Sequence, residues 1–199
     1  MYDSGMTLSH LVSALREEVD IAGSIPDSSY IRWASSLEQL LYSDLIFFAS
    51  SQNVELTDGG FSLSSVSPGE NEDNVRFDDI LKIYGDGIEY SKCSIITSVI
   101  FTGEKNIFYE IGGNVKVSPI SVPGTVTLVR RIRPKIKDSL DSDIMLPYEW
   151  VELMASKLRG ESYKLANDDG QAAKWLEDYN AQLSSFTEWV SKRQERYGE

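Results

Sequence analysis

The sequence has few residues that form disulfides or bind zinc, with one cysteine, Cys93, and one histidine, His10, among 199 residues. A single cysteine cannot form an intramolecular disulfide, which excludes a disulfide-stabilised secreted scaffold and agrees with folding in a reducing cytoplasm. A structural zinc is excluded as well, because it would need several cysteine or histidine ligands at short spacing. Triads of the Ser-His or Cys-His type would depend on His10, and no other feature supports that role. We therefore expect no catalytic residue, no metal and no cofactor.

Long apolar runs are also missing. No stretch approaches the roughly 20 apolar residues that a membrane-spanning helix requires, and the longest candidate lies around residues 45–49. The first residues, Met1 to Ser4, are polar and acidic, unlike a signal peptide. No association with a membrane is expected.

Basic residues are scarce relative to acidic ones, since 19 lysines and arginines face 31 aspartates and glutamates, a formal charge of −12. Residues 1–50 contain 7 acids and 2 bases, residues 51–137 contain 11 and 10, and residues 138–199 contain 13 and 7. The acidic excess therefore lies at the two ends of the chain. Such a surface is poorly suited to wrapping nucleic acid, because phosphate binding relies on lysine and arginine.

The densest group of basic residues lies at and after residue 130, near the end of a predicted strand over residues 125–132, and consists of Arg130, Arg131, Arg133, Lys135 and Lys137. Strand alternation places Arg131 and Arg133 on one face and Arg130 on the other. Two interpretations remain open, namely pairing with acidic surface on a neighbouring copy or partner, or pairing with the chain's own acidic helices. On the first interpretation Arg130, Arg131 and Arg133 are candidate inter-subunit residues.

Apolar residues recur at steps of three and four near the N-terminus, which predicts two amphipathic helices there. The first begins near Thr7 and ends at Gly23. The second is capped by Asp27 or Ser28 and is expected to run to about Ser50.

The same spacing near the C-terminus predicts an antiparallel helical hairpin. Its first helix starts near Leu146, with Pro147 in the first turn, where a proline costs no intrahelical hydrogen bond. Residues 166–170 combine capping residues with a glycine and end this helix. A second helix then begins at Gln171 and presents an apolar stripe as far as Val190.

Between these helical regions the periodicity changes to two, and β-branched residues become frequent. Turn sequences that contain glycine or proline separate the segments. The predicted antiparallel strands are residues 82–84, 88–90, 94–101, 106–111, 115–117 and 125–132. We expect residues 62–74 to form a mobile loop, because they contain few apolar residues. The acids around them lack the spacing of a calcium loop and are expected to be solvated, namely Glu70, Glu72, Asp73, Asp78 and Asp79.

This order of elements predicts an α+β fold, an antiparallel α-helical bundle of about four helices with an inserted antiparallel β domain. The N-terminal helices of the helical domain occupy residues 1–52 and the β-rich insertion occupies residues 53–134. The C-terminal helical hairpin and tail, residues 135–199, complete the helical domain.

Three stretches resemble the head-to-tail adaptor (connector) proteins of tailed bacteriophages. Residues 25–34, IPDSSYIRWA, resemble that family's second helix, with an acidic cap before an apolar face. Residues 124–131, GTVTLVRR, followed by Pro134, resemble its closing strand, although the family commonly has tyrosine where this chain continues with two arginines. Residues 146–150 and 165–179 resemble its C-terminal helical hairpin. In the order of its elements, the resemblance covers nearly the whole chain.

The resemblance implies a non-enzymatic structural protein of the virion, made in the host cytoplasm and located at the neck between head and tail. Copies of the chain would form a ring, usually of twelve, that binds the portal protein and extends the DNA channel. The ring would provide the attachment surface for the next tail or neck protein. DNA would pass through the channel without specific binding, since an acidic lumen repels it.

The C-terminal segment of the family often docks on the portal, which makes the end of this chain a candidate portal-binding site. The segment mixes hydrophobic anchors with charge, as a docking tail would. Its candidate residues are Trp189, Val190, Lys192, Arg193, Arg196 and Tyr197. A frayed, solvated terminus is the alternative.

Two other functions are compatible with the residues. The first is a stand-alone binding module, in which a β-sandwich recognises carbohydrate or protein through an aromatic platform formed by Tyr84, Tyr90, Phe101, Phe108 and Tyr109. The second is a carboxylate-based hydrolase, which would need two acids facing each other in a cleft.

Overall fold

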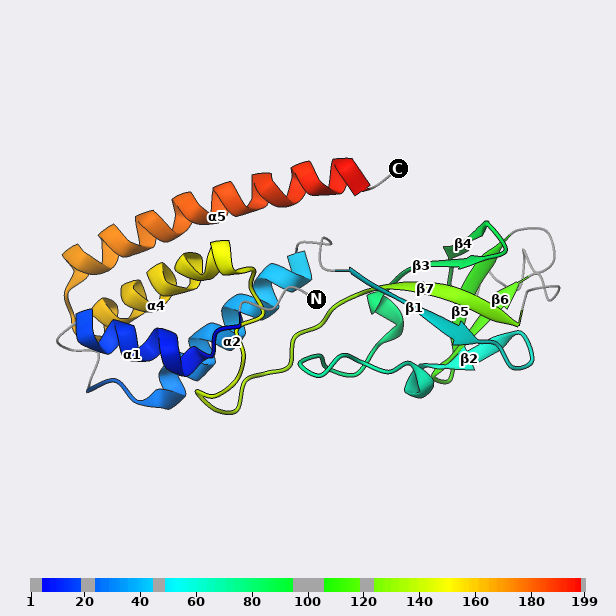
Figure 1. The fold of residues 1–199 in the computed structure, drawn as a ribbon, viewed down its shortest axis with the longest axis horizontal. Coiled ribbons are helices and arrows are strands. Elements are labelled where there is room, and N and C mark those ends of the chain that lie inside the picture. Colours follow the sequence, from blue (N-terminus) through cyan, green and yellow to red (C-terminus); the bar gives the residue numbers. More distant parts are fainter. Residues whose placement is uncertain (1–4, 19–23, 45–48, 95–105, 119–123, 198–199) are drawn as a thin grey trace. The chain divides into compact units, whose positions relative to one another are not determined.

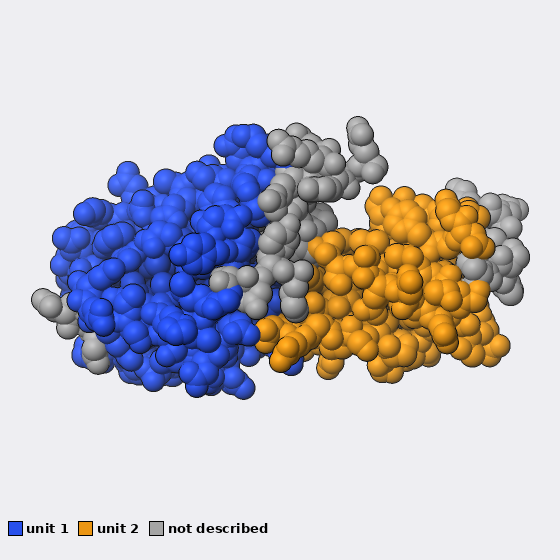
Figure 2. Space-filling model, viewed as in Figure 1, with its two compact units in different colours: residues 1–47, 134–199 blue, residues 48–133 orange. Residues whose placement is uncertain are grey.

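The computed structural model describes residues 5–18, 24–44, 49–94, 106–118 and 124–197. The chain divides into two compact units, one formed by Met1–Phe47 with Pro134–Glu199 and the other by Phe48–Arg133 (Figure 2). The first unit is helical and the second contains a β-sheet. Each is described by itself below.

The helical unit contains α1 (Leu8–Glu18), α2 (Asp27–Asp44), α4 (Val151–Leu165) and α5 (Asp169–Tyr197). A 3-10 turn, η4 (Tyr148–Trp150), precedes α4, and Pro147 stands immediately before it. The buried face of α1 consists of Leu8, Leu11, Val12 and Leu15, at the three- and four-residue steps read from the sequence. In the described residues no helix is both long enough and apolar enough to cross a bilayer.

The α4–α5 hairpin turns through two adjacent polar residues. Asn167 adopts a left-handed conformation with φ 59°, which ends α4, and the Asp168 N–H donates to the Tyr163 carbonyl at 3.0 Å. Asp168 Oδ1 then accepts the Gln171 N–H at 3.1 Å and caps α5. Figure 1 shows α4 lying along α5, which continues past the N-terminal end of α4.

One arginine connects three helices of this unit. Arg159 on α4 is 9% exposed, donates to Glu18 of α1 at 2.7 Å and forms an ion pair with Glu152. Its guanidinium also lies 4.7 Å from the centre of the Trp175 ring of α5. Further along the hairpin the Trp150, Phe186 and Trp189 rings pack with centroids 5.0–5.7 Å apart.

A buried ion pair attaches the returning chain to α2. Lys137 Nζ lies 2.8 Å from Glu38 Oε2, and both side chains are less than 5% exposed. Glu38 Oε1 also accepts the Met145 N–H at 2.8 Å, and the Tyr42 hydroxyl donates to the Met145 carbonyl. Residues 144–146 are buried beside this pair, so the start of the helical hairpin is fixed against α2.

In its described residues the second unit contains a seven-stranded sheet with strand order β1-β7-β3-β4-β5-β6-β2. Its strands are β1 (Ala49–Glu55), β2 (Gly60–Ser62), β3 (Ile80–Gly85), β4 (Ile88–Lys92), β5 (Ile107–Ile111), β6 (Asn114–Ser118) and β7 (Thr125–Arg131). All pairs are antiparallel except β4–β5, which is parallel over Ser91–Lys92 and Ile107–Phe108. The strands at the two ends of this order, β1 and β2 (Figure 1), meet at an antiparallel bridge between Thr57 and Gly60, so the sheet is barrel-like and nearly closed.

The inward faces of the strands meet in one apolar core. Alternate residues of β7, Val126 and Leu128, are buried there, as period-two side-chain direction requires. The other members are Val54, Phe61, Val66, Val75, Ile80, Ile83, Tyr90, Phe108, Val115 and Val117.

The predicted fold class, an antiparallel α-helical bundle with an inserted antiparallel β domain, is wrong. The structure is α+β with four α-helices in its described residues, but the dominant feature is a seven-stranded, mixed, nearly closed sheet. Alternation of apolar and polar residues identifies a strand but does not show which strand it pairs with. The parallel pairing of β4 with β5 was therefore not predicted. β1 was missed because the sequence Ala49–Glu55 has little β propensity, and its pairing with β7 supplies the strand.

Two local predictions also need correction. The second helix ends at Asp44 rather than near Ser50, because β1 begins at Ala49. Residues 62–74, predicted as a mobile loop, include the end of β2 and a 3-10 turn, η2 (Leu63–Ser65), and Val66 and Glu72 are buried. The predicted strand 94–101 lies outside the described residues apart from Ser94.

The close approach of α4 to α5 predicts that Gly160→Ala destabilises the protein. A Cβ at Gly160 would lie 2.8 Å from Leu176 Cγ and Cδ2 and 3.4 Å from the Leu176 backbone nitrogen. Overpacking of this kind costs about 1–3 kcal/mol, more than the gain of about 1 kcal/mol in helix propensity. Urea unfolding measures the difference.

Gly170→Ala is the matched control, because Gly170 is also helical and its nearest neighbour would be Asp168 Oδ1 at 3.7 Å. That variant should be as stable as the parent or more so. Equal stability of the Gly160 and Gly170 variants would contradict the tight helix contact.

Candidate inter-subunit site

Strand β7 carries an arginine in its row of core side chains. Val126, Leu128 and Arg130 are all buried on the same face, and Arg130 is only 2% exposed. A guanidinium is always charged, so burying it requires a partner of opposite charge.

The partner is Glu72, from the segment between β2 and β3. Arg130 Nη1 lies 2.6 Å from Glu72 Oε2, and the two side chains are 3% and 4% exposed. The backbone around Glu72 is held in place, because the Asp73 N–H donates to the Arg133 carbonyl at 2.7 Å. Neither Glu72 Oε2 nor Arg130 Nε has a hydrogen-bond partner in the described part of the chain, so opposite charge holds this pair.

A second ion pair fixes Arg133, two residues beyond the end of β7. Arg133 Nη2 donates to Asp79 Oδ1 at 2.6 Å, and Asp79 is 1% exposed. Asp79 Oδ2 also accepts the Arg76 N–H at 2.9 Å, so both carboxylate oxygens are in use. This hydrogen bond with Asp79 raises the pKa of the Arg133 guanidinium above its ordinary value.

Two further ion pairs near Glu72 and Asp79 are more exposed, and their interactions are weaker. Arg76 and Asp73 are 3.8 Å apart with exposed side chains, and Lys92 lies 3.6 Å from Asp78. The Lys92 ammonium also lies 4.3 Å from the centre of the Phe77 ring. Exposed pairs of this kind contribute about 0–1 kcal/mol each.

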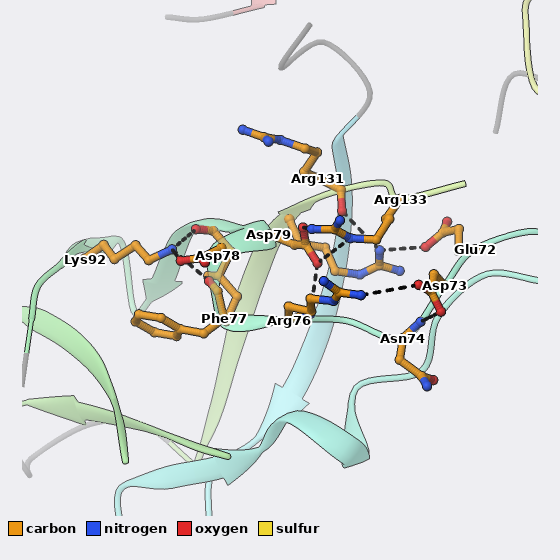
Figure 3. A network of polar contacts seen from close by, with 12 residues as sticks. Glu72, Asp73, Asn74, Arg76, Phe77, Asp78, Asp79, Lys92, Arg131 and Arg133 are labelled. Carbon is orange, nitrogen blue, oxygen red and sulfur yellow. Dashed lines mark hydrogen bonds and ion pairs between the residues drawn. The ribbon is translucent and has the colours of Figure 1, made fainter. Parts of the chain in front are cut away.

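Arg131 differs from its two neighbours. It is half-buried, and its guanidinium has no ion-pair partner among the residues that the structure describes. In Figure 3 its side chain points away from the cluster, while Arg133 points into it. Of the three candidate inter-subunit residues, Arg130 and Arg133 therefore make ion pairs within the chain, and Arg131 points away from those pairs.

Sequence reasoning missed Glu72 and Asp79 as partners, because acids in a serine- and glycine-rich segment read as solvated. One signal was available, since alternation places Arg130 on the face of Val126 and Leu128, where a charge needs a buried acid. Arg130 and Arg133 pair with Glu72 and Asp79 of the β unit. The sequence had suggested acids of a neighbouring copy or of the chain's own helices instead.

The candidate portal-binding residues lie in the second half of α5. Val190 is 1% exposed and belongs to the core of the helical unit, while the half-buried Trp189 ring stacks on Phe186. Lys192 is exposed and pairs with Glu188 at 2.6 Å. The side chains of Arg193, Arg196 and Tyr197 lie outside the described residues.

The proposed aromatic platform is largely core. Tyr90 and Phe108 are 2% and 0% exposed, whereas Tyr84 and Tyr109 are half-buried. Phe101 lies outside the described residues. The buried rings cannot stack on a ligand, which weakens the carbohydrate-binding interpretation based on them.

The described residues contain no group of three His, Cys, Asp or Glu side chains placed to hold a metal. Cys93 is half-buried, and burial raises the pKa of its thiol. His10 accepts or donates one hydrogen bond with Thr7 at 3.1 Å on an exposed face. The ion pairs of the β unit hold Glu72 against Arg130 of β7 and Asp79 against Arg133.

The burial of the Glu72–Arg130 pair predicts that Glu72→Gln destabilises the protein by about 3–5 kcal/mol, because it leaves Arg130 charged and uncompensated. Asp73→Asn is the control, because its ion pair is long and exposed, and it should change stability by about 0.5 kcal/mol or less. Chemical unfolding followed by the fluorescence and circular dichroism of each variant measures both. Similar small losses for the two variants would show that the buried pair contributes little.

The sequence matches no protein-family model and none of the curated proteins compared with it.

Proposed function

We propose that this chain is a head-to-tail adaptor of a tailed bacteriophage, a structural protein of the virion neck. Copies form a ring, expected to contain twelve, that binds the portal and extends the DNA channel. The ring offers its other surface to the next tail or neck protein. The chain acts by assembly and has no catalytic role.

The observation that carries this proposal is the α4–α5 hairpin, whose sequence bears the strongest resemblance to the family. α5 has 29 residues, about 44 Å at the ordinary helical rise, against 15 residues and about 22 Å for α4. Among the α5 side chains that the structure describes, up to Lys192, one stripe is buried, at Ala172, Tyr179, Phe186 and Val190. Its remaining faces are exposed and polar, and they are available to neighbouring copies.

Charge provides a second line of support. The helical unit contains 20 acidic and 11 basic residues, a formal charge of −9 out of −12 for the chain. A closed ring needs two different faces on each copy, one for each neighbour. Arg131 supplies a cation without an ionic partner in the described residues, which suits an acidic face on the next copy.

Electron microscopy of negatively stained protein, alone and mixed with the portal of the same phage, tests the proposal. We expect circular assemblies stacked on the portal, with one copy of this chain for each portal subunit. A monodisperse monomer that leaves the portal bare would contradict it.

The role of Arg131 predicts that Arg131→Glu abolishes ring formation without loss of folding, because like charges would then meet between copies. Arg131→Lys keeps the charge and should retain most assembly. Mass photometry or native mass spectrometry measures the population of rings. Unchanged assembly of Arg131→Glu would remove Arg131 from the interface without excluding a ring formed by α5.

Portal docking by the end of α5 predicts that removal of residues 192–199 weakens portal binding at least tenfold. The truncated chain should keep its fold, because Phe186, Trp189 and Val190 remain in place. Co-sedimentation with the portal measures binding, and circular dichroism measures helix content. Undiminished portal binding would assign docking to another part of the chain.

A further inference from the structure

The nearly closed sheet leaves a groove of about 820 Å³ between its two edge strands. One wall is β1, through Gln52, Asn53, Val54 and Glu55, and the other includes Phe61 and Ser62 of β2. Four consecutive residues of β1 border the groove, so the backbone edge of this strand faces it.

The register of β1 with β7 identifies the backbone groups on that edge. The Leu56 N–H donates to the Gly124 carbonyl at 2.8 Å, which sets the phase of the ladder. Alternate residues of an antiparallel strand exchange hydrogen bonds with the partner, and the residues between them point away. Ser51, Asn53 and Glu55 therefore direct their N–H and C=O groups away from β7, where the described residues provide no partner strand.

Most backbone groups of the opposite wall already have partners. Gly60 of β2 exchanges two backbone hydrogen bonds with Thr57, at 2.7 and 3.1 Å. The Ser62 carbonyl accepts a hydrogen bond from Ser65 Oγ at 2.7 Å. The groove thus has one wall with unused backbone groups, β1, and one wall that closes the space opposite it.

This geometry decides what can enter the groove. A whole second sheet cannot bring its edge to β1, because the β2 wall stands on the other side of the groove. A single extended segment needs less room and can lie along β1. β1 also lacks the features that block strand addition, since its outward residues include no proline, no lysine and no bulge.

We propose that this groove binds a single extended polypeptide segment of a partner protein, which adds to β1 as a further strand. Its inward side chains would be apolar, because Val54 and Phe61 border the core at this position. Its outward side chains would be uncharged or basic, because the exposed Glu55 carboxylate lies beside them. The inference depends on the β unit alone and stands whether or not the chain forms a ring.

The test uses a capped eight-residue peptide, acetyl-KVTVTVTK-amide, added to the isotope-labelled full chain. Hydrogen exchange measured by NMR should slow at least tenfold for the amides of Ser51, Asn53 and Glu55. The amides of Gln52 and Val54 already bond to β7 and should change little. The same peptide with alternate backbone nitrogens methylated should not produce the protection.

Ser51→Pro provides a matched variant, because it removes an outward N–H without removing a bond to β7, and Ser51→Ala is its control. The proline variant should bind the peptide at least tenfold more weakly than the alanine variant. The methylated peptide keeps the inference testable if the proline variant does not fold.

Equal binding of the methylated peptide, or no protection of the three amides, would overturn the inference. Self-association of the chain that protects them without peptide would also overturn it, since a second copy would then occupy the edge.

Discussion

The helical unit depends on a buried ion pair between α2 and the returning chain. The unit is formed by two separate stretches of sequence, and Glu38 and Lys137 are in contact at 2.8 Å where the second stretch returns. Burial raises the pKa of Glu38, and the ammonium of Lys137 opposes that shift by stabilising the carboxylate. Because either charge alone would be costly to bury, the pair specifies one position for residues 137–146 and therefore for the start of α4.

The β unit is also held together by ion pairs with buried acidic partners. Glu72–Arg130 and Asp79–Arg133 fix a polar segment against β7, as Glu38–Lys137 fixes the returning chain against α2. In both units, charges that look like surface features in the sequence are internal contacts. Among the described residues, Arg131 has no ion-pair partner and the outer edge of β1 has no partner strand.

Elements with strong local signals could be predicted from the sequence. The α4–α5 hairpin follows from helical spacing and the polar turn, although Asn167 rather than the glycine takes the left-handed conformation. Five strands follow from alternation. Pairing could not be predicted, because the strand character of Ala49–Glu55 comes from β7, and the burial of Glu72 comes from an arginine 58 positions later. Such contacts join distant parts of the chain and leave little local trace.

A double-mutant cycle on Glu38→Gln and Lys137→Met tests most directly whether a buried pair closes the helical unit. Each single variant should lose about 3–5 kcal/mol of unfolding free energy, because it leaves one buried polar partner unmatched. The double variant should lose less than the sum by at least about 1 kcal/mol, since neither group is then left alone. Losses that add to within about 0.5 kcal/mol would contradict the account.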